Sequence, residues 1–453
     1  MRNLRAGFVP ARSYSRIGGV AAACLLAAAP LPSWAASPAL AAGAAPVAAP
    51  YASGPTIADF YQARAGRPLW LSPQSGAAAA AMLELLDSAA IDGLNPDRYP
   101  IRRAAKALRD ARRGDTRAVN RAELLLSQAF VSYARDLRTA PNIGIVYVDR
   151  DLAPAPPTPR SLLERAAAAP SLEAFVQNLG WMNPTYAQLR RALAAGQNSP
   201  TERAQLAVNL ERARALPADE RRYLVVNTAA QRLYVYDNGQ LIDSMRVVVG
   251  KPKYPTPMMH AFIRAAALNP YWNVPPDLAA ERIAPNVVKQ GTGYLRSMGY
   301  QLLSDWSDHP TVVDPATVDW QAVADGRVEV RIRQLPGPQN ALGKMKFVFP
   351  NAEGIFLHDT PDRQLLTEAS RLYSGGCIRL EDAGRLGRWL FGRDLKKTGS
   401  APEQMVPIPA LVPLYITYMT AVPSGNAIAY FDDVYGRDAA RLAALGGGRI
   451  ASR

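Results

Sequence analysis

The chain has 453 residues, 49% of them hydrophobic, and a formal net charge of +14. This length allows two or three domains with substantial cores. Nucleic acid is excluded as a partner because no basic run is interleaved with aromatic side chains. The positive net charge is better explained by a partner outside the cytoplasm, either an anionic polymer or a membrane surface. The alternative is that the basic surface only keeps the protein soluble.

The first 41 residues have the pattern of an export signal. A start rich in arginine precedes an alanine-rich apolar run from 17 to 31, and Ser33-Trp34-Ala35 offers small residues at cleavage spacing. Pro30 and Pro32 interrupt the run, which falls short of the roughly 20 residues of a membrane-spanning helix. We therefore expect a periplasmic protein whose signal is either cleaved or kept as an anchor. Residues 42–54, rich in alanine and proline, read as a linker.

Residues 55–200 have a helical pattern and predict a scaffold domain. Apolar residues recur at helical spacing on two segments, which places them on one face of each helix. These residues are Met82, Leu85, Leu86 and Ala89 in the first segment and Phe130, Tyr133, Ala134 and Leu137 in the second. No cluster of titratable residues stands out in this half of the chain.

Residues 201–445 predict a mainly antiparallel β domain, so the whole chain is expected to be α+β. Runs rich in β-branched and aromatic residues cover 223–227, 232–236, 244–249, 328–333, 346–349 and 355–357. Asp237-Asn238-Gly239 between two of these runs is a strong hairpin signal. The partly helical segment from about 270 to 326 interrupts the strands and is a candidate lid.

Cys377 is the only cysteine outside the expected signal. Structural cysteines of exported proteins normally pair, so an unpaired thiol is either tolerated or used. Most lone cysteines are buried and inert. Here Gly375 and Gly376 precede the thiol, and glycines permit a tight turn and close approach rather than core packing. The pattern favours a nucleophile.

The chemistry of a thiol nucleophile requires further groups near Cys377. A free thiol is only slightly ionised at neutral pH, so an imidazole must accept its proton. His358, at the end of a predicted strand, is the candidate base. The backbone amides of Gly376 and Cys377 are candidates for an oxyanion hole, in which one donor contributes about 3 kcal/mol.

Other polar residues near the motif have two readings each. Asp359 either orients the imidazole or caps a turn, because a backbone carbonyl can orient the ring as well. Arg379 either holds a substrate carboxylate and lowers the thiol pKa or ties the loop to the sheet, and we favour the structural role. Ser374 is interpreted as a turn residue or hydrogen-bond partner rather than a second nucleophile. His260 and His309 are interpreted as bystanders.

With three histidines and one cysteine outside the signal, no metal-ligand spacing appears, so neither a metal nor a cofactor is expected.

His358 followed by Ser374-Gly375-Gly376-Cys377-Ile378-Arg379 resembles the signature of the L,D-transpeptidase (YkuD-type) catalytic domain. Further segments are similar to the large, lid-bearing YcbB-like subgroup, and the resemblance extends over most of residues 55–440. The segments are Val249-Gly250-Lys251-Pro252 with Thr256-Pro257-Met258, Asn269 to Pro276, Gly337 to Gly343, Leu357 to Pro361 and Asp432 to Asp438, with Phe60-Tyr61, Leu69-Trp70 and Asp92 to Pro96 in the scaffold.

The sequence departs from this family pattern in two places. Gly375 stands where many members carry His or Arg and the YcbB-like subgroup carries serine, so side-chain assistance from this position is absent. The subgroup also commonly has a peptidoglycan-binding module between scaffold and catalytic domain, whereas residues 193–206 form only a short connector here. Substrate anchoring is then expected to use a basic surface or a partner.

The resemblance implies a peptidoglycan L,D-transpeptidase that forms 3→3 cross-links through a thioester on Cys377. Its expected partners are stem peptides of peptidoglycan and other cell-wall synthases, and carbapenems are expected to acylate the same sulfur. One alternative is a carboxypeptidase or hydrolase on the same fold, which includes release of a wall-linked lipoprotein. The other is a non-catalytic wall-binding scaffold.

Overall fold

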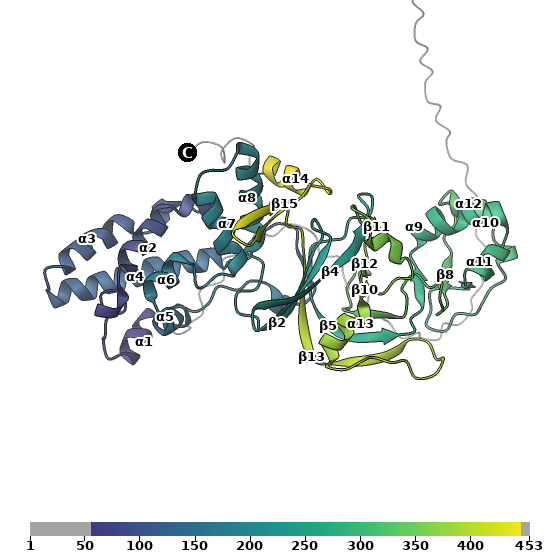
Figure 1. Ribbon diagram of the computed structural model, residues 1–453, viewed down its shortest axis with the longest axis horizontal. Coiled ribbons are helices and arrows are strands. Elements are labelled where there is room, and N and C mark those ends of the chain that lie inside the picture. Colours follow the sequence, from purple (N-terminus) through teal and green to yellow (C-terminus); the bar gives the residue numbers. More distant parts are fainter. Residues whose placement is uncertain (1–55, 445–453) are drawn as a thin grey trace, which may run out of the picture. The chain divides into compact units, whose positions relative to one another are not determined.

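The computed structural model describes residues 56–444 (Figure 1). The predicted signal over residues 1–41 and the linker over 42–54 lie outside this range. Among the described residues, no helix combines the length and apolarity needed to cross a bilayer. A helical half is followed by a β-rich half, which confirms the expected α+β class.

The helical half consists of amphipathic helices, several of which begin at a side-chain cap. Thr56 and Ser199 each form a reciprocal capping box at the start of a helix. Asn183 caps another helix and is followed by a proline at its first position, where the missing N–H costs nothing. The helices are α1 (Ile57–Ala63), α2 (Ala78–Asp87), α3 (Ile101–Ala111), α4 (Thr116–Leu137), α5 (Pro159–Ala168), α6 (Leu172–Gln177), α7 (Pro184–Ala194) and α8 (Pro200–Ala213).

The apolar faces predicted from the sequence form the core of this half. Met82 and Leu86 of α2 and Phe130 and Leu137 of α4 are fully buried in one cluster. Rings in this core meet edge to face, as Phe130 does with Trp181 at 5.0 Å between centroids. Helix α8 adds Leu206 and Leu210 to the same cluster, so the first helix after residue 200 packs with the scaffold.

One buried carboxylate organises the polar part of the scaffold core. Asp92, in a 3-10 turn after α2, accepts hydrogen bonds from the hydroxyls of Tyr133 and Tyr186, each at 2.6 Å. The Arg190 guanidinium pairs with the same carboxylate at 2.8 Å. Because every partner is present, this buried charge stabilises the packing of α4 against α7.

The β-rich half is built on a mixed, mainly antiparallel sheet in the order β1-β5-β13-β2-β3-β4-β12-β10-β9, and a β5–β9 pairing closes it on itself. Asn238 and Gly239 turn the β2–β3–β4 meander with positive φ angles, as the hairpin signal predicts. The strands are β1 (Val146–Tyr147), β2 (Arg222–Asn227), β3 (Arg232–Asp237), β4 (Gln240–Gly250), β5 (Met259–Leu268), β9 (Met345–Val348), β10 (Leu357–His358), β11 (Leu372–Ser374), β12 (Ile378–Leu380) and β13 (Gln404–Thr417).

One face of this sheet forms the second core. Leu357 and Ile378 on neighbouring strands are fully buried there, and helix α13 (Ala383–Phe391) adds Leu386 and Leu390 to the same cluster. Because side chains alternate along a strand, the residues next to these point to the opposite face. That opposite face carries the candidate site.

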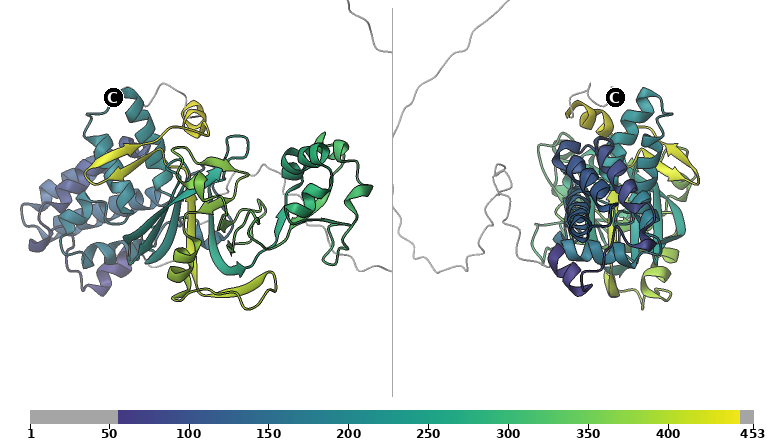
Figure 2. Two further views of the ribbon diagram at one scale, coloured as in Figure 1. Left: turned by 45° about the vertical axis from the view of Figure 1, so that its right-hand side comes forward. Right: turned by 90° about the vertical axis from the view of Figure 1, so that its left-hand side faces the viewer.

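The candidate lid forms a separate unit with its own core (Figure 2). Its helices are α9 (Pro276–Leu278), the π-helical turn η5 (Ala279–Ile283), α10 (Ala284–Gln290), α11 (Gly293–Ser297) and α12 (Trp320–Ala324), and its strands are β6 (Trp272–Val274), β7 (Tyr300–Leu303) and β8 (Arg331–Gln334). The run expected over 328–333 therefore pairs within the lid and not within the main sheet. Its alternation predicts a strand but does not specify a partner, and burial of Ile332 in the lid core decides the pairing.

After the main sheet the chain returns to the scaffold. The hairpin of β14 (Ala421–Ser424) and β15 (Ala427–Tyr430) begins with Ala421, which is buried in the scaffold core, and helix α14 (Arg437–Ala444) follows. The side chain of Gln205 in α8 donates to the backbone carbonyls of Thr420 and Phe431. Scaffold and β domain thus share polar contacts as well as apolar packing.

Candidate active site

The predicted nucleophile lies in a tight turn between β11 and β12. Gly376 has φ +115°, a conformation that side chains strongly disfavour, and a Cβ there would lie 3.2 Å from Ile355 Cδ1. The Ser374 hydroxyl donates to the Cys377 carbonyl at 2.6 Å and accepts from the Gly376 N–H at 3.1 Å. Ser374 therefore holds the turn closed with its side chain.

This geometry differs from one part of the predicted oxyanion hole. The Gly376 N–H was expected to point at a substrate oxygen, but it is engaged by the Ser374 hydroxyl. The reason is the positive φ of Gly376, which the tripeptide spacing of the motif does not reveal. The Cys377 amide remains the predicted donor of this turn.

The strand register brings the predicted base beside the thiol. His358 of β10 pairs with Arg379 of β12 in a parallel ladder, and Leu357 pairs with Ile378. Since Leu357 and Ile378 face the core, His358, Arg379 and Cys377 share the opposite face. Lys346 of β9, directly across from His358, extends this row. His358 of β10 and Cys377, which directly precedes β12, thus lie on the same face of the sheet although they are 19 residues apart in the chain.

The His358 ring is oriented by a backbone carbonyl. Its Nδ1 lies 2.6 Å from the Asp359 carbonyl oxygen, which can only accept, so Nδ1 carries the proton in the neutral ring. The lone pair of that tautomer is on Nε2, the nitrogen that a general base requires. The Asp359 carboxylate turns elsewhere, to the Lys344 N–H at 2.9 Å and the Arg363 guanidinium at 2.6 Å.

The electrostatics of the site favour a neutral thiol and a neutral imidazole. Burial raises the pKa of Cys377 above its ordinary value, while the Phe356 backbone N–H, Arg379 and Lys346 oppose this shift. Burial, with a smaller effect of Arg379 and Lys346, lowers the pKa of His358 to about 3. At neutral pH both the thiol and the imidazole are therefore uncharged.

The two cations beside the pair have carboxylate partners of their own. Arg379 forms an ion pair with Asp362 at 2.9 Å, which ties the segment after β10 to β12 as the structural reading of Arg379 expects. Lys346 lies 3.1 Å from Glu403, and the same Glu403 carboxylate accepts from the Tyr271 N–H at 2.7 Å. The positive row is thus held in place next to the thiol.

The lid reaches the nucleophile turn directly. A Cβ added to Gly375 would lie 2.8 Å from Leu278 Cδ1, so the absent side chain at this position leaves room for a lid leucine. Arg282 of the lid donates to the Tyr373 carbonyl at 3.3 Å. Glu281 accepts from Lys253 and the Tyr254 hydroxyl, each at 2.8 Å, and also binds Lys251. These contacts hold the lid against the loop after β4.

The loop after β4 also forms hydrogen bonds to the turn that carries Cys377. The hydroxyl of Thr256, a fully buried residue, donates to the Gly376 carbonyl at 2.7 Å and accepts from the Gly250 N–H at 2.9 Å. The Tyr435 hydroxyl binds the Gly250 carbonyl at 2.6 Å, and Arg437 binds the Thr256 carbonyl at 2.9 Å. The segments around Gly250, Thr256 and Tyr435, which are among those that resemble the family, therefore stabilise the nucleophile turn through hydrogen bonds.

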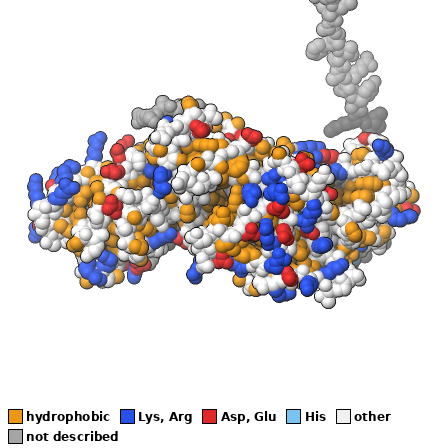
Figure 3. All heavy atoms as spheres, in the orientation of Figure 1, with side chains coloured by type: hydrophobic (Ala, Val, Ile, Leu, Met, Phe, Trp, Pro, Cys, Tyr) orange, Lys and Arg blue, Asp and Glu red, His pale blue; other side chains and the backbone are white. Residues whose placement is uncertain are grey.

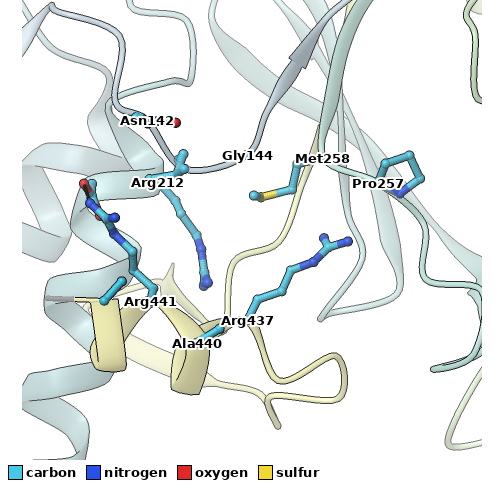
Figure 4. Close-up of a pocket in the computed structure, with 11 residues that line it drawn as sticks. Asn142, Gly144, Arg212, Pro257, Met258, Arg437, Ala440 and Arg441 are labelled. Carbon is cyan, nitrogen blue, oxygen red and sulfur yellow. Dashed lines mark hydrogen bonds and ion pairs between the residues drawn. The ribbon is translucent and has the colours of Figure 1, made fainter. Parts of the chain in front are cut away.

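Arg437 also borders a cavity of about 360 Å³ between α8, the segment 142–144 and α14 (Figure 4). Figure 4 shows Arg212 and Arg441 on its other sides. Arg441 pairs with Glu211 and Arg212 with Asp438, so the two helices are joined by ion pairs beside this cavity. The cavity lies next to Pro257 and Met258, directly after the Thr256 support.

The remaining histidines lie apart from the thiol. His260 on β5 is fully buried between Tyr147 and Tyr415, and His309 is exposed. No group of three or more His, Cys, Asp or Glu gathers within residues 56–444 in a way that could hold a metal ion.

Two residues of the site were missed by reasoning from the sequence. Lys346 and Phe356 both act on the thiol, one through its charge and one through its backbone N–H. Lys346 begins a predicted strand and Phe356 precedes His358 by two residues on another. Only the register between these strands shows that they face Cys377.

Family models match both halves of the chain. Residues 221–395 match the L,D-transpeptidase catalytic domain named YkuD, and residues 55–193 match a domain described as Scaffold domain. The part of the chain that carries the Cys377 turn and His358 thus matches the L,D-transpeptidase catalytic domain named YkuD. The predicted resemblance is confirmed at this level.

Individual relatives carry the same description. A Haemophilus influenzae protein named "Putative L,D-transpeptidase" is 32% identical over 276 residues, which cover 58% of this chain and 55% of that protein. The chain thus matches about half the length of this curated relative. Among solved structures, an L,D-transpeptidase from Mycobacterium smegmatis is 14% identical, with a TM-score of 0.23 over 44% of this chain and 58% of that chain. The L,D-transpeptidase LdtMt1 in complex with imipenem is also 14% identical, with a TM-score of 0.22 over 44% and 59%.

Proposed function

We propose that this protein is an exported peptidoglycan L,D-transpeptidase that forms 3→3 cross-links through a thioester on Cys377. The observation that supports this proposal is the pairing of β10 with β12, in which His358 lies on the same face of the sheet as Cys377, the residue directly before β12. The hydrogen bond from Nδ1 to the Asp359 carbonyl leaves Nε2 as the basic nitrogen. The family of the catalytic domain supports peptidoglycan as the substrate.

In the acylation step, the Cys377 sulfur attacks the carbonyl carbon of the L,D-peptide bond in a tetrapeptide stem. Nε2 of His358 takes the thiol proton, because a neutral thiol needs a base at the moment of attack. The Cys377 N–H stabilises the negative oxygen of the tetrahedral intermediate. The C–N bond then breaks, the leaving D-alanine amine receives the proton from His358, and a thioester remains.

In the second step, an amine from a neighbouring stem attacks the thioester carbonyl. His358 accepts the proton of this amine and returns it to the departing sulfur, so the thiol is regenerated. Arg379 and Lys346 lower the pKa of His358, which favours rapid release of the proton in both steps. The lid lies against the turn and would limit access of water, which competes with the amine.

The location and partners follow from the same proposal. A peptidoglycan substrate places the protein in the periplasm, in agreement with the export pattern of residues 1–41. Other cell-wall synthases would supply the uncross-linked stems. Carbapenems would acylate Cys377 as substrate analogues, and a solved relative is described as a complex with imipenem.

Intact-mass spectrometry of the purified protein tests the proposal. Incubation with disaccharide-tetrapeptide should give an adduct on Cys377 and cross-linked dimers, and both should disappear in Cys377→Ala. His309→Ala, an exposed histidine of the lid, serves as the matched control and should keep full activity. Dimer formation by Cys377→Ala would refute the proposal. Trimmed monomers without dimers would assign a hydrolase on the same fold instead.

A further inference from the structure

The scaffold carries a dense group of exposed cations. Between residues 101 and 121 all eight basic side chains are exposed, against only two carboxylates, a net charge of +6. They are Arg102, Arg103, Lys106, Arg109, Arg112, Arg113, Arg117 and Arg121. Figure 3 shows Lys and Arg side chains gathering at the end of the scaffold where Figure 1 places α3. We call residues 101–121 the basic hairpin.

Four of these cations lie in a line along α3 and its C-terminal end. Arg102, Lys106, Arg109 and Arg113 follow one another at spacings of four, three and four residues, which puts them on one face of a helix. At 1.5 Å per residue the line is about 16 Å long. The opposite face packs through Ala107 and Ala111 against α4. Burial of small residues on one side thus presents the cationic line to solvent on the other.

These cations have almost no partners within the described chain. Lys106 pairs with Asp110 at 2.9 Å, whereas the other seven have no carboxylate within ion-pair distance among residues 56–444. Elsewhere in the chain, exposed arginines are paired more often, as in Arg160 with Glu164 and Arg327 with Asp325. Like charges at this spacing repel one another, so the isolated hairpin is destabilised by its own charge. An anionic ligand would relieve that repulsion.

The surface between the cations indicates what kind of anion fits. No large hydrophobic side chain of residues 101–121 is exposed. Peripheral membrane helices normally insert several apolar side chains between lipids, whereas the exposed apolar side chain nearest to Arg121 along α4 is a single one, Leu124. A line of cations without apolar neighbours instead complements a linear polymer with carboxylates at intervals.

We propose that the basic hairpin binds the carboxylates of the peptidoglycan polymer and anchors the enzyme on its substrate. This inference rests on the proposed function for the identity of the polymer, and it assigns to the scaffold the anchoring task of the missing binding module. The contact is electrostatic and exposed, so it weakens as salt rises.

Co-sedimentation with purified, lipid-free peptidoglycan sacculi tests the proposal. The protein is the full chain with Cys377→Ala, so that binding is measured without turnover. The test variant changes Arg102, Lys106, Arg109 and Arg113 to Gln, which keeps helix propensity. The matched control changes the exposed cations Arg221, Arg393, Lys396 and Lys397 to Gln, with the same loss of charge.

We expect the test variant to bind sacculi roughly tenfold more weakly than the parent, because four exposed ion pairs are lost. The control should stay within about twofold of the parent. Sacculi whose carboxylates have been chemically amidated should bind the parent as weakly as native sacculi bind the test variant. The salt dependence of the test variant should be shallower.

Equal loss in the test and control variants would overturn the proposal, since it would indicate net charge alone. Undiminished binding to amidated sacculi would also overturn it. So would binding confined to vesicles containing 30% phosphatidylglycerol, which would assign the hairpin to the membrane.

The carbapenem adduct on Cys377, measured in the hairpin variant with its thiol intact, reports on catalysis separately. Its absence in the protein that keeps both Cys377 and an unchanged basic hairpin would remove the proposed function while the binding result stands.

Discussion

His260 and His358 lie in two regions of the same closed sheet and share one property that is often taken as a sign of a catalytic residue, a strongly shifted pKa. Both are buried, and burial lowers the pKa of each to about 3. Their surroundings differ. His260 lies between Tyr147 and Tyr415, with neither ring nitrogen in a hydrogen bond of normal geometry. The Nδ1 atom of His358 is fixed by a backbone carbonyl, and the Cys377 thiol lies in the turn directly before the neighbouring strand.

The difference shows that a shifted pKa alone does not identify a base. Desolvation shifts any buried imidazole, whether or not it can do chemistry. Three features distinguish His358. Its hydrogen bond defines the tautomer, and the proposed nucleophile Cys377 lies on the same face of the sheet. Arg379 and Lys346 also disfavour the protonated imidazole. His260 has none of these features, so we interpret it as a residue that packs between the rings of Tyr147 and Tyr415.

The largest expected effect is a difference in the rate of Cys377 acylation between variants of His358 and His260. His358→Ala should lower the rate of Cys377 acylation by about 10²- to 10⁴-fold, the usual contribution of a general base. His260→Phe should leave the rate within about twofold, because the ring remains between the two tyrosines. Intact-mass kinetics with a carbapenem measure both. A large loss in His260→Phe with unchanged melting temperature would erase the distinction.

The second prediction uses the property that the two histidines share. The folded pKa of about 3 lies below the unfolded value of about 6.5, so the unfolded chain binds more protons between these pH values. Stability should therefore fall as pH drops through this window, by about 1.4 kcal/mol per pH unit for each histidine. His260→Phe should remove about one such contribution in urea unfolding measured from pH 6.5 to 3.5. An unchanged slope would mean that His260 is protonated in the folded protein.

The third prediction concerns the thiol beside His358. Because burial raises the pKa of Cys377, alkylation by iodoacetamide should increase about tenfold per pH unit until the pH passes the ordinary thiol range. Arg379→Gln should shift this profile to higher pH, since the guanidinium favours the thiolate. The control is Arg393→Gln, an exposed arginine. A plateau near neutral pH would show a preformed thiolate and contradict the neutral pair.

A smaller effect is expected from Asp359→Asn. The ring of His358 is held by the Asp359 carbonyl, which this change preserves, so the pH profile of acylation should not move. The lost ion pair with Arg363 should lower the free energy of unfolding by about 1 kcal/mol. The pH dependence of acylation and urea unfolding measure the two effects separately. A displaced pH profile would show that the carboxylate, rather than the carbonyl, tunes the imidazole.

The smallest effect is expected at the lid, which contacts the His358 region and not the His260 region. Glu281→Gln keeps the shape of the side chain but removes the charge that binds Lys251 and Lys253. We expect a two- to fivefold change in acylation rate, as for an exposed ion pair. The Asp325→Asn change, which breaks an exposed pair elsewhere in the lid, is the control. Equal effects of both changes would argue against a specific contact between lid and turn.

Much of the fold could be predicted because its signals are local. The buried faces of α2 and α4 follow from helical spacing, and the β3–β4 turn follows from Asn238-Gly239. The assignment of β8 to the lid could not be predicted, because alternation defines a strand without naming its neighbour. The same limit applies to α8, whose apolar face fits the scaffold core although the residue pattern changes near position 200.

The sequence by itself determined which two side chains are proposed to react, because a lone thiol after two glycines and a histidine at a strand end can be read directly from the chain. The tertiary structure decided which groups meet them. Strand register placed Lys346 and Phe356 beside Cys377, and the positive φ of Gly376 turned its amide toward Ser374. The strand register depends on pairings between distant segments, which residue spacing along the chain does not encode.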